Sequence, residues 1–277
     1  MKRLMQSFVS LSLITVLAAL IAPNGALAQG KTEVLWLGQA AVRITSPGGK
    51  VIMIDPFLRK NPKTPAKWKD LKALGKIDVI LVTHGHFDHT ADAGALAKLT
   101  GAKIAGSAEL VRNMAAYGMV SPKQVIAMNK GGTITPIGPN IKLTLVPADH
   151  SSSLAVTNPM TKKREYIFGG PATGWVVQLE NGFTIYHSGD TNVFTDMGLI
   201  AKLYPIDLAM VAIGGHFTMD PRGAAHAVSQ FLTPKMALPI HYGTFPPLKG
   251  TPAQFKAALG NAKVKVLDLQ PGGALKF

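Results

Sequence analysis

The 277-residue sequence contains no cysteine, so disulfide bridges and thiolate ligands are both excluded. A chain that lacks such crosslinks depends on its hydrophobic core, and this one is long enough to form a sizeable core. Without thiolates, a metal site has only histidine, aspartate, glutamate and water as ligands.

Acidic residues are also scarce, with 15 Asp and Glu against 29 Lys and Arg, for a formal net charge of +14. The basic side chains concentrate in residues 59–76 and 162–164, where few aromatic residues accompany them. No nucleic-acid-binding motif is present, so we expect no nucleic-acid partner. The charge is explained either by a solvated surface or by attraction of a small, anionic substrate.

Long apolar runs are absent after residue 28. Before it, Lys2 and Arg3 precede the apolar residues 8–21, and Ala26-Leu27-Ala28 has the small residues of a cleavage site. This pattern predicts a secretory signal peptide over residues 1–28, and hence export to the bacterial periplasm or beyond, with an uncleaved anchor as the alternative. We expect one domain over residues 29–277 and no stable membrane span. Nothing in the pattern indicates an oligomeric state.

Short apolar runs and helical patterns alternate along residues 29–277, which favours two β-sheets packed face to face with helices outside. Residues 59–73 and 151–170 are expected to be loops, because the first is basic and marked by proline and the second is polar and ends in glycine. Helices are predicted over residues 92–99, 109–117, 195–203 and 221–232. Strands are predicted over residues 33–36, 41–45, 51–54, 77–82, 103–105, 125–128, 141–147, 174–179, 183–187, 208–213 and 236–240.

The segment Thr83-His84-Gly85-His86-Phe87-Asp88-His89 follows the apolar run 77–82 and places three imidazoles and one carboxylate within six residues. Neutral imidazole is the commonest protein ligand for zinc and related metals. Three further strand ends carry a candidate ligand, namely His150, Asp190 and His241. Since ligand sites of open α/β sheets lie beyond the carboxyl ends of strands, these residues predict a metal centre.

The sequence resembles the metallo-β-lactamase superfamily, because residues 83–89 are similar to its His-x-His-x-Asp-His motif and the later ligands follow in the expected order. Other segments resemble the lactonase-like branch of metal-dependent hydrolases, related to ascorbate-phosphate lactonase. These segments are residues 36–41, 54–57, 187–191, 214–219 and 241–246. The resemblance implies a four-layer αβ/βα sandwich, an α/β (α+β) fold of two mixed β-sheets flanked by helices.

The resemblance also implies two divalent metal ions, zinc in the first place, with manganese, nickel or iron as alternatives. Asp190 would bridge the two metals. The other ligands implied are His84, His86 and His150 for the first metal, and Asp88, His89 and His241 for the second.

The implied activity is hydrolysis by a metal-bound hydroxide of an ester, lactone or phosphodiester. Asp88 is a candidate catalytic residue that could orient the hydroxide and carry a proton, and His216 is a candidate for contacting the substrate or oxyanion. The bridging Asp190 favours these substrates over β-lactams. A β-lactamase acting on antibiotics and a non-catalytic metal-binding envelope protein remain alternatives.

Three other residues have two possible roles each. Asp55 could accept a hydrogen bond from a ligand imidazole or cap the following turn. Tyr242 could donate a proton or pack beside His241. Asp220, which precedes Pro221, is predicted to be a helix N-cap and not a ligand.

Overall fold

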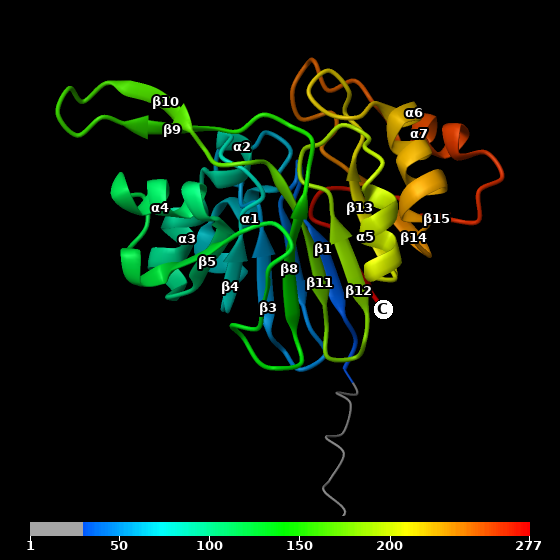
Figure 1. Cartoon of the computed structure of the whole chain (residues 1–277), viewed down its shortest axis with the longest axis horizontal. Helices are drawn as coiled ribbons and strands as arrows, with labels where there is room; N and C mark the ends of the chain where they lie inside the picture. The colour runs from blue at the N-terminus through cyan, green and yellow to red at the C-terminus, as the bar shows by residue number, and fades with distance from the viewer. Residues whose placement is uncertain (1–29) are drawn as a thin grey trace, which may run out of the picture.

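The computed structural model describes residues 30–277, so the predicted signal peptide lies outside the described residues. Within that range two seven-stranded β-sheets face each other, and helices cover their outer faces (Figure 1). This confirms the expected four-layer sandwich of two mixed sheets. No helix of residues 30–277 is both long and apolar enough to cross a membrane.

The first sheet is antiparallel on the side of the chain ends and parallel on the other side. Strand β1 pairs antiparallel with β2 and with the C-terminal β16, whereas β3, β4, β5 and β6 run parallel. In spatial order the sheet contains β16 (Ala274–Lys276), β1 (Glu33–Trp36), β2 (Val42–Thr45), β3 (Val51–Ile54), β4 (Val79–Leu81), β5 (Lys103–Ser107) and β6 (Val125–Met128).

The second sheet has the same division between parallel and antiparallel pairs. Strands β12, β13, β14 and β15 are parallel, and β11 runs antiparallel between β12 and β8. In spatial order it contains β15 (Lys265–Val266), β14 (Met236–Ile240), β13 (Leu208–Ala212), β12 (Thr184–His187), β11 (Thr173–Gln178), β8 (Lys142–Pro147) and β7 (Thr133–Ile134). Because β8, β12 and β14 point the same way, their carboxyl ends meet at one edge of the sheet.

Three apolar cores hold the layers together. In β3 all four residues are buried, and the alternation of a strand sends Ile52 and Ile54 into the core between the sheets and Val51 and Met53 against the outer helices. Burying such a side chain contributes about 1.5–3 kcal/mol. A third core lies between the second sheet and its helices.

The helices are short and occupy the two outer layers (Figure 1). Helices α3 and α4 cover the first sheet, and α5, α6 and α7 cover the second. A π-helical segment, η3, continues α6, so the helix predicted over residues 221–232 is one helical run. The helical bounds are α1 (Ala66–Lys69), η1 (Leu71–Leu74), α2 (Phe87–Thr90), α3 (Ala93–Thr100), α4 (Ala108–Ala116), η2 (Pro122–Gln124), α5 (Met197–Leu203), α6 (Pro221–His226), η3 (Ala227–Leu232) and α7 (Pro252–Leu259).

Both segments that were predicted to be loops contain regular structure. Residues 59–73 include α1 and most of η1, whose first turn is capped by Asp70. Residues 151–170 form a two-stranded hairpin of β9 (Ser153–Thr157) and β10 (Arg164–Phe168). The prediction of a loop was wrong there because the hairpin lies outside both sheets, where neither strand needs a continuous apolar face.

Candidate metal centre

Loops from both sheets converge where their strands end. The His84 to His89 segment follows β4 of the first sheet and continues into α2. From the second sheet, His150 follows β8, Asp190 follows β12, and His241 directly follows β14. The seven predicted ligands therefore meet at one edge of the sandwich.

The ligand atoms form two groups that share Asp190. Each group has four residues whose ligand atoms lie within 4.8 Å of one another. Each group also draws side chains from both sheets. The groups are His84, His86, His150 and Asp190, and Asp88, His89, Asp190 and His241.

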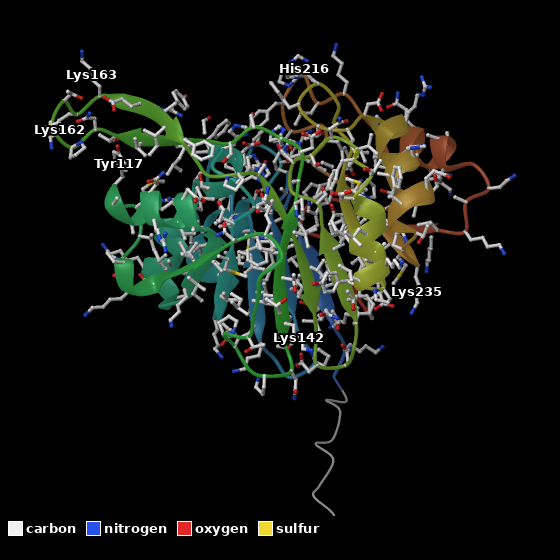
Figure 2. All side chains as sticks on the ribbon, viewed as in Figure 1. Tyr117, Lys142, Lys162, Lys163, His216 and Lys235 are labelled. Carbon is white, nitrogen blue, oxygen red and sulfur yellow. The ribbon has the colours of Figure 1, made fainter. Side chains whose placement is uncertain are left out.

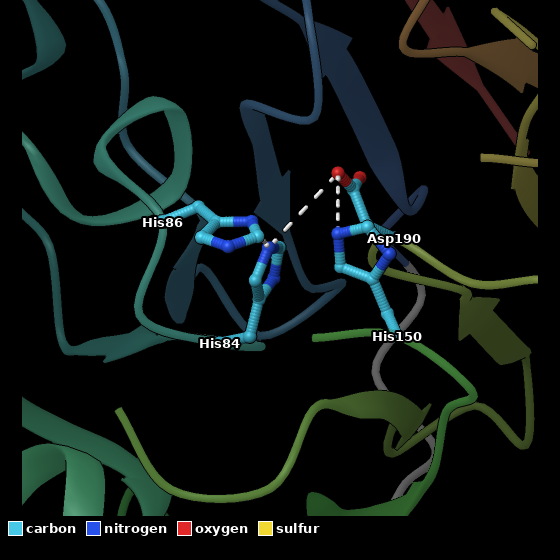
Figure 3. Close-up of side chains that lie close together, drawn as sticks. All are labelled: His84, His86, His150 and Asp190. Carbon is cyan, nitrogen blue, oxygen red and sulfur yellow. Dashed lines mark hydrogen bonds and ion pairs between the residues drawn. The ribbon is translucent and has the colours of Figure 1, made fainter. Parts of the chain in front are cut away.

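Asp190 lies between the groups and directs one carboxylate oxygen to each. Its Oδ2 lies 4.0 Å from His84 Nε2 and 3.7 Å from His150 Nε2 (Figure 3). Its Oδ1 lies 3.0 Å from His241 Nε2 and 3.3 Å from His89 Nε2. This is the arrangement expected of a carboxylate that bridges two cations.

Asp55 holds His89 from the side opposite the ligand atom. The carboxylate is fully buried and its Oδ2 lies 2.8 Å from His89 Nδ1. It also accepts hydrogen bonds from the backbone N–H and the hydroxyl of Thr83, at 2.8 and 2.7 Å. Since a carboxylate accepts and does not donate, it keeps the proton on Nδ1 and leaves Nε2 free to bind a metal. Asp55 therefore accepts a hydrogen bond from the imidazole of a candidate ligand, which is the first of the two roles considered for it.

Gln39 contacts two other members of the second group, at the atoms that face the cluster. Its amide Nε2 donates to Asp88 Oδ2 at 2.9 Å and lies 2.7 Å from His241 Nε2. The Gln39 side chain is fully buried and its backbone has a positive φ of 52°, a conformation that non-glycine residues rarely adopt. Asp55 and His241 also have positive φ, at 46° and 57°. Three of the six non-glycine residues with positive φ among the described residues therefore lie at the candidate metal centre, and such backbone strain is common at functional sites.

In the metal-free protein the two groups differ in protonation. Burial lowers the pKa of His84 well below its usual range, and burial lowers the pKa of His86 and His150 as well. Burial also opposes the charged form of His241, but the Asp190 carboxylate prevails and raises the pKa of His241 to about 9. The first group is thus ready to bind a cation at neutral pH, whereas the second must first release protons.

The donor set fits two divalent cations. Among the described residues, several buried polar atoms of the cluster have no hydrogen-bond partner, including Asp190 Oδ1, His89 Nε2 and His150 Nε2. Unpaired buried polar atoms are costly, so their convergence on one point indicates a ligand they are built to hold. Imidazole and carboxylate donors without thiolate suit zinc, manganese, iron or nickel.

The cluster opens into a cleft of about 490 Å³. Five of the candidate ligands line it, and its other lining residues are mostly apolar and largely aromatic. These apolar and aromatic residues are Phe87, Tyr166, Phe217, Phe245, Pro247 and Leu248. A wider hollow of about 760 Å³ beside α6 and α7 contains neither ligand group. The candidate ligands therefore assign the site to the cleft of about 490 Å³, which we call the metal cleft.

The structure does not bring every predicted residue to the cluster. His216 lies on an exposed loop with a φ of 60°, its ring packs against Phe217, and it is not among the residues lining the cleft (Figure 2). Tyr242 packs 5.5 Å from the Trp36 ring, and burial raises its pKa to about 12. Asp220 caps α6, as predicted, by accepting a hydrogen bond from the Gly223 N–H at 2.7 Å.

Two features of the site were missed from the sequence. Gln39 was noted only as part of a motif, although its place in a glycine turn after β1 is a signal for an unusual backbone. The hairpin of β9 and β10 was not predicted, although Tyr166-Ile167-Phe168 consists of residues common in strands and Asn158-Pro159 favours a turn. Tyr166 on this hairpin lines the cleft.

Comparison with known proteins agrees with the geometry. Residues 50–242 match the sequence model of a family described as the Beta-lactamase superfamily domain. A UPF0173 metal-dependent hydrolase of Cupriavidus necator is 52% identical over 92% of this chain and 89% of its own length. One from a Polaromonas species is 51% identical over 90% of this chain and 91% of its own. A solved metallo hydrolase of the archaeon Ignicoccus hospitalis is 32% identical, with a TM-score of 0.76, over 89% of this chain and 98% of the other.

Proposed function

The chain belongs to the metallo-β-lactamase superfamily and is a metal-dependent hydrolase, and from this we propose that it uses two divalent cations to cleave an ester, lactone or phosphodiester. The observation that carries the proposal is the placement of Asp190, whose two oxygens face the two ligand groups separately. Bound there, the cations would polarise the scissile group and lower the pKa of a water molecule. We propose zinc in both groups, since histidine and carboxylate ligands suit it.

The chain's own residues fix the orientation of the reacting groups. Asp88 lines the cleft, and the Gln39 amide holds its Oδ2 at 2.9 Å. A carboxylate held in this way can accept a proton from the attacking water and return it to the leaving group. His216 remains a predicted substrate contact from the neighbouring loop.

The cleft supports a small substrate bound with its scissile bond over the ligands. A volume of about 490 Å³ is within the range of small-molecule sites. The bridging position of Asp190 favours esters, lactones and phosphodiesters over β-lactams. Export by the signal peptide, and with it a periplasmic or secreted site of action, also remains a proposal that depends on residues 1–28.

The test is metal analysis combined with a substrate screen. We expect two equivalents of metal per chain, hydrolysis of a member of the ester, lactone or phosphodiester panel, loss of that hydrolysis on chelation, and recovery on adding zinc. Asp190→Ala should lose both metal and activity. Asp149→Ala is the matched control, because Asp149 is exposed beside His150 but belongs to neither ligand group.

Three results would contradict the proposal. Activity that survives complete removal of metal excludes the cations from the chemistry. One equivalent of metal in the fully active protein excludes the paired site. Turnover of nitrocefin that exceeds turnover of every ester, lactone and phosphodiester in the screen assigns the protein to β-lactams instead.

A further inference from the structure

An aromatic wall stands on one side of the metal cleft. The Phe87 side chain is 49% exposed, yet its ring is held by two neighbours. It packs edge-on against the buried Phe57, at 5.7 Å between centroids, and 6.0 Å from Phe245. Phe87 and the candidate ligand Asp88 are consecutive residues, and both line the metal cleft. The exposed ring of Phe87 therefore offers a flat apolar surface beside the candidate ligands.

The hairpin of β9 and β10 adds a second ring to this wall. The hairpin projects beyond the sandwich near α2 (Figure 1), and its base is fastened to the ligand loop by a hydrogen bond from Gly85 N–H to Ser152 Oγ at 3.0 Å. A Cβ on Gly85 would meet Ser153 O at 3.0 Å, so glycine permits this close approach. Tyr166 on β10 is 66% exposed and lines the cleft.

A second hollow adjoins the metal cleft at these two rings. It has a volume of about 610 Å³, and Phe87 and Tyr166 line both spaces. Its charged residues are Lys60 and Arg164, and none of the described residues that line it is acidic. The Arg164 guanidinium lies 5.1 Å from the centre of the Tyr166 ring, so the cation is placed directly beside the aromatic wall.

We propose that this second hollow is a binding site for an anionic group of the substrate. The substrate class is then an amphiphilic anion. Its scissile bond lies over the metal ligands, its apolar part lies between Phe87 and Tyr166, and its negative charge faces Lys60 and Arg164. The inference rests on the proposed function for the position of the scissile bond, but the second site itself depends only on the residues that line it.

The contacts favour this local site over a general effect of the basic surface. Lys162 and Lys163, which share the hairpin with Arg164, lie at its outer end and line neither hollow (Figure 2). Arg164 and Tyr166 are two positions apart on β10, and so lie on the same face of the strand. The opposite partners of these residues, Thr157 and Ala155, also line the second hollow.

The test is calorimetric binding of non-hydrolysable probes to the metal-loaded protein. The first probe is 4-phenylbutane-1-sulfonate, which has both a ring and a negative charge. Butane-1-sulfonate lacks the ring, and 4-phenylbutyl methyl sulfone lacks the charge. We expect the first probe to bind more tightly than either of the others, each part contributing about fivefold to affinity.

Two double variants separate the local site from long-range attraction. Lys60→Gln with Arg164→Gln should weaken the phenylbutane sulfonate about fivefold and leave the sulfone nearly unchanged. Lys162→Gln with Lys163→Gln removes the same charge from the end of the hairpin and should change neither affinity. Tyr166→Ala should weaken both ring-containing probes. Thermal unfolding of each variant confirms that it is folded.

The proposal is overturned if the sulfonate and the sulfone bind alike, or if no probe binds. It is also overturned if the Lys60 and Arg164 variant binds the sulfonate like the unmodified protein, because the anion then sits on the metals. An equal loss of affinity for the sulfonate in both double variants overturns it as well, because the binding then depends on the overall charge of the protein. Since no turnover is measured, failure of the hydrolysis screen with sulfonate binding intact removes the proposed function and leaves the anion site.

Discussion

Asp55→Asn tests the role assigned to the carboxylate behind His89. Asparagine has nearly the same volume and tolerates the positive φ of 46° at this position. Its carbonyl oxygen is needed to accept from the Thr83 N–H, so its amide nitrogen replaces the oxygen that lies 2.8 Å from His89 Nδ1. Nδ1 must then accept a hydrogen bond and the proton moves to Nε2, the atom that faces Asp190. A protonated Nε2 does not bind a metal.

The expected loss of metal affinity is about 10- to 100-fold, the usual effect of removing such a supporting contact, or about 1.4–2.8 kcal/mol. It should fall on the group that contains His89 and spare the group that contains His84. Titration of the metal-free protein with zinc against a chromogenic chelator measures both affinities. The expected curve has one site unchanged and one site weakened.

Asp92→Asn is the matched control. Asp92 is also buried, and accepts hydrogen bonds from the backbone of Leu58 and Arg59 and from the Arg59 side chain, but contacts no ligand. Both variants should lose about 1–3 kcal/mol of unfolding free energy, because each weakens a buried hydrogen-bonded carboxylate site. Only Asp55→Asn should lose metal affinity. Equal zinc affinities in Asp55→Asn and the unmodified protein refute the tautomer argument.

Three other predictions follow from the site and its surroundings. Gln39→Ala should lower kcat about tenfold with two metals still bound, because Asp88 loses a charge-assisted hydrogen bond. Metal analysis together with steady-state kinetics checks this prediction, and an unchanged kcat contradicts it. In the metal-free protein, protonated His241 stabilises the fold fully below pH 6.5, and this contribution disappears as the pH rises through its raised pKa of about 9. Thermal unfolding between pH 6 and 10 should show this loss of stability in the metal-free protein. The zinc-loaded protein should show no such loss. Asp220→Ala should cost about 1 kcal/mol of stability as a lost N-cap, with metal content and kcat unchanged; a drop in metal content would make Asp220 a ligand.

The clustering of the candidate ligands could be predicted from the sequence because histidine is rare in such density and because strand ends are visible as apolar runs that stop at a polar residue. The run 77–82 and the histidines that follow it needed no knowledge of long-range contacts. Asp190 and His241 were found for the same reason, since each follows a strand that is apolar enough to be recognised.

The missed parts depend on contacts between residues far apart in the chain. The β16 strand at the C-terminus joins the first sheet by pairing with β1, and neither strand carries a local signal for this partner. The fully buried side chain of Gln39 has two polar contacts, with Asp88 and His241, and both residues are at least 49 positions away. By contrast, α7 had a local signal that was overlooked, because Thr251 and Gln254 form a capping box around Pro252.

The division of the candidate ligands between the two sheets also limits when a metal site can form during folding. Residues 84–89 precede His150, Asp190 and His241 in the chain, so neither group can be complete when only the strands β1 to β6 have formed. The second group needs His241, which follows β14 near the end of the chain. A complete metal site therefore cannot guide the earliest steps of folding, because it forms only where the two sheets meet.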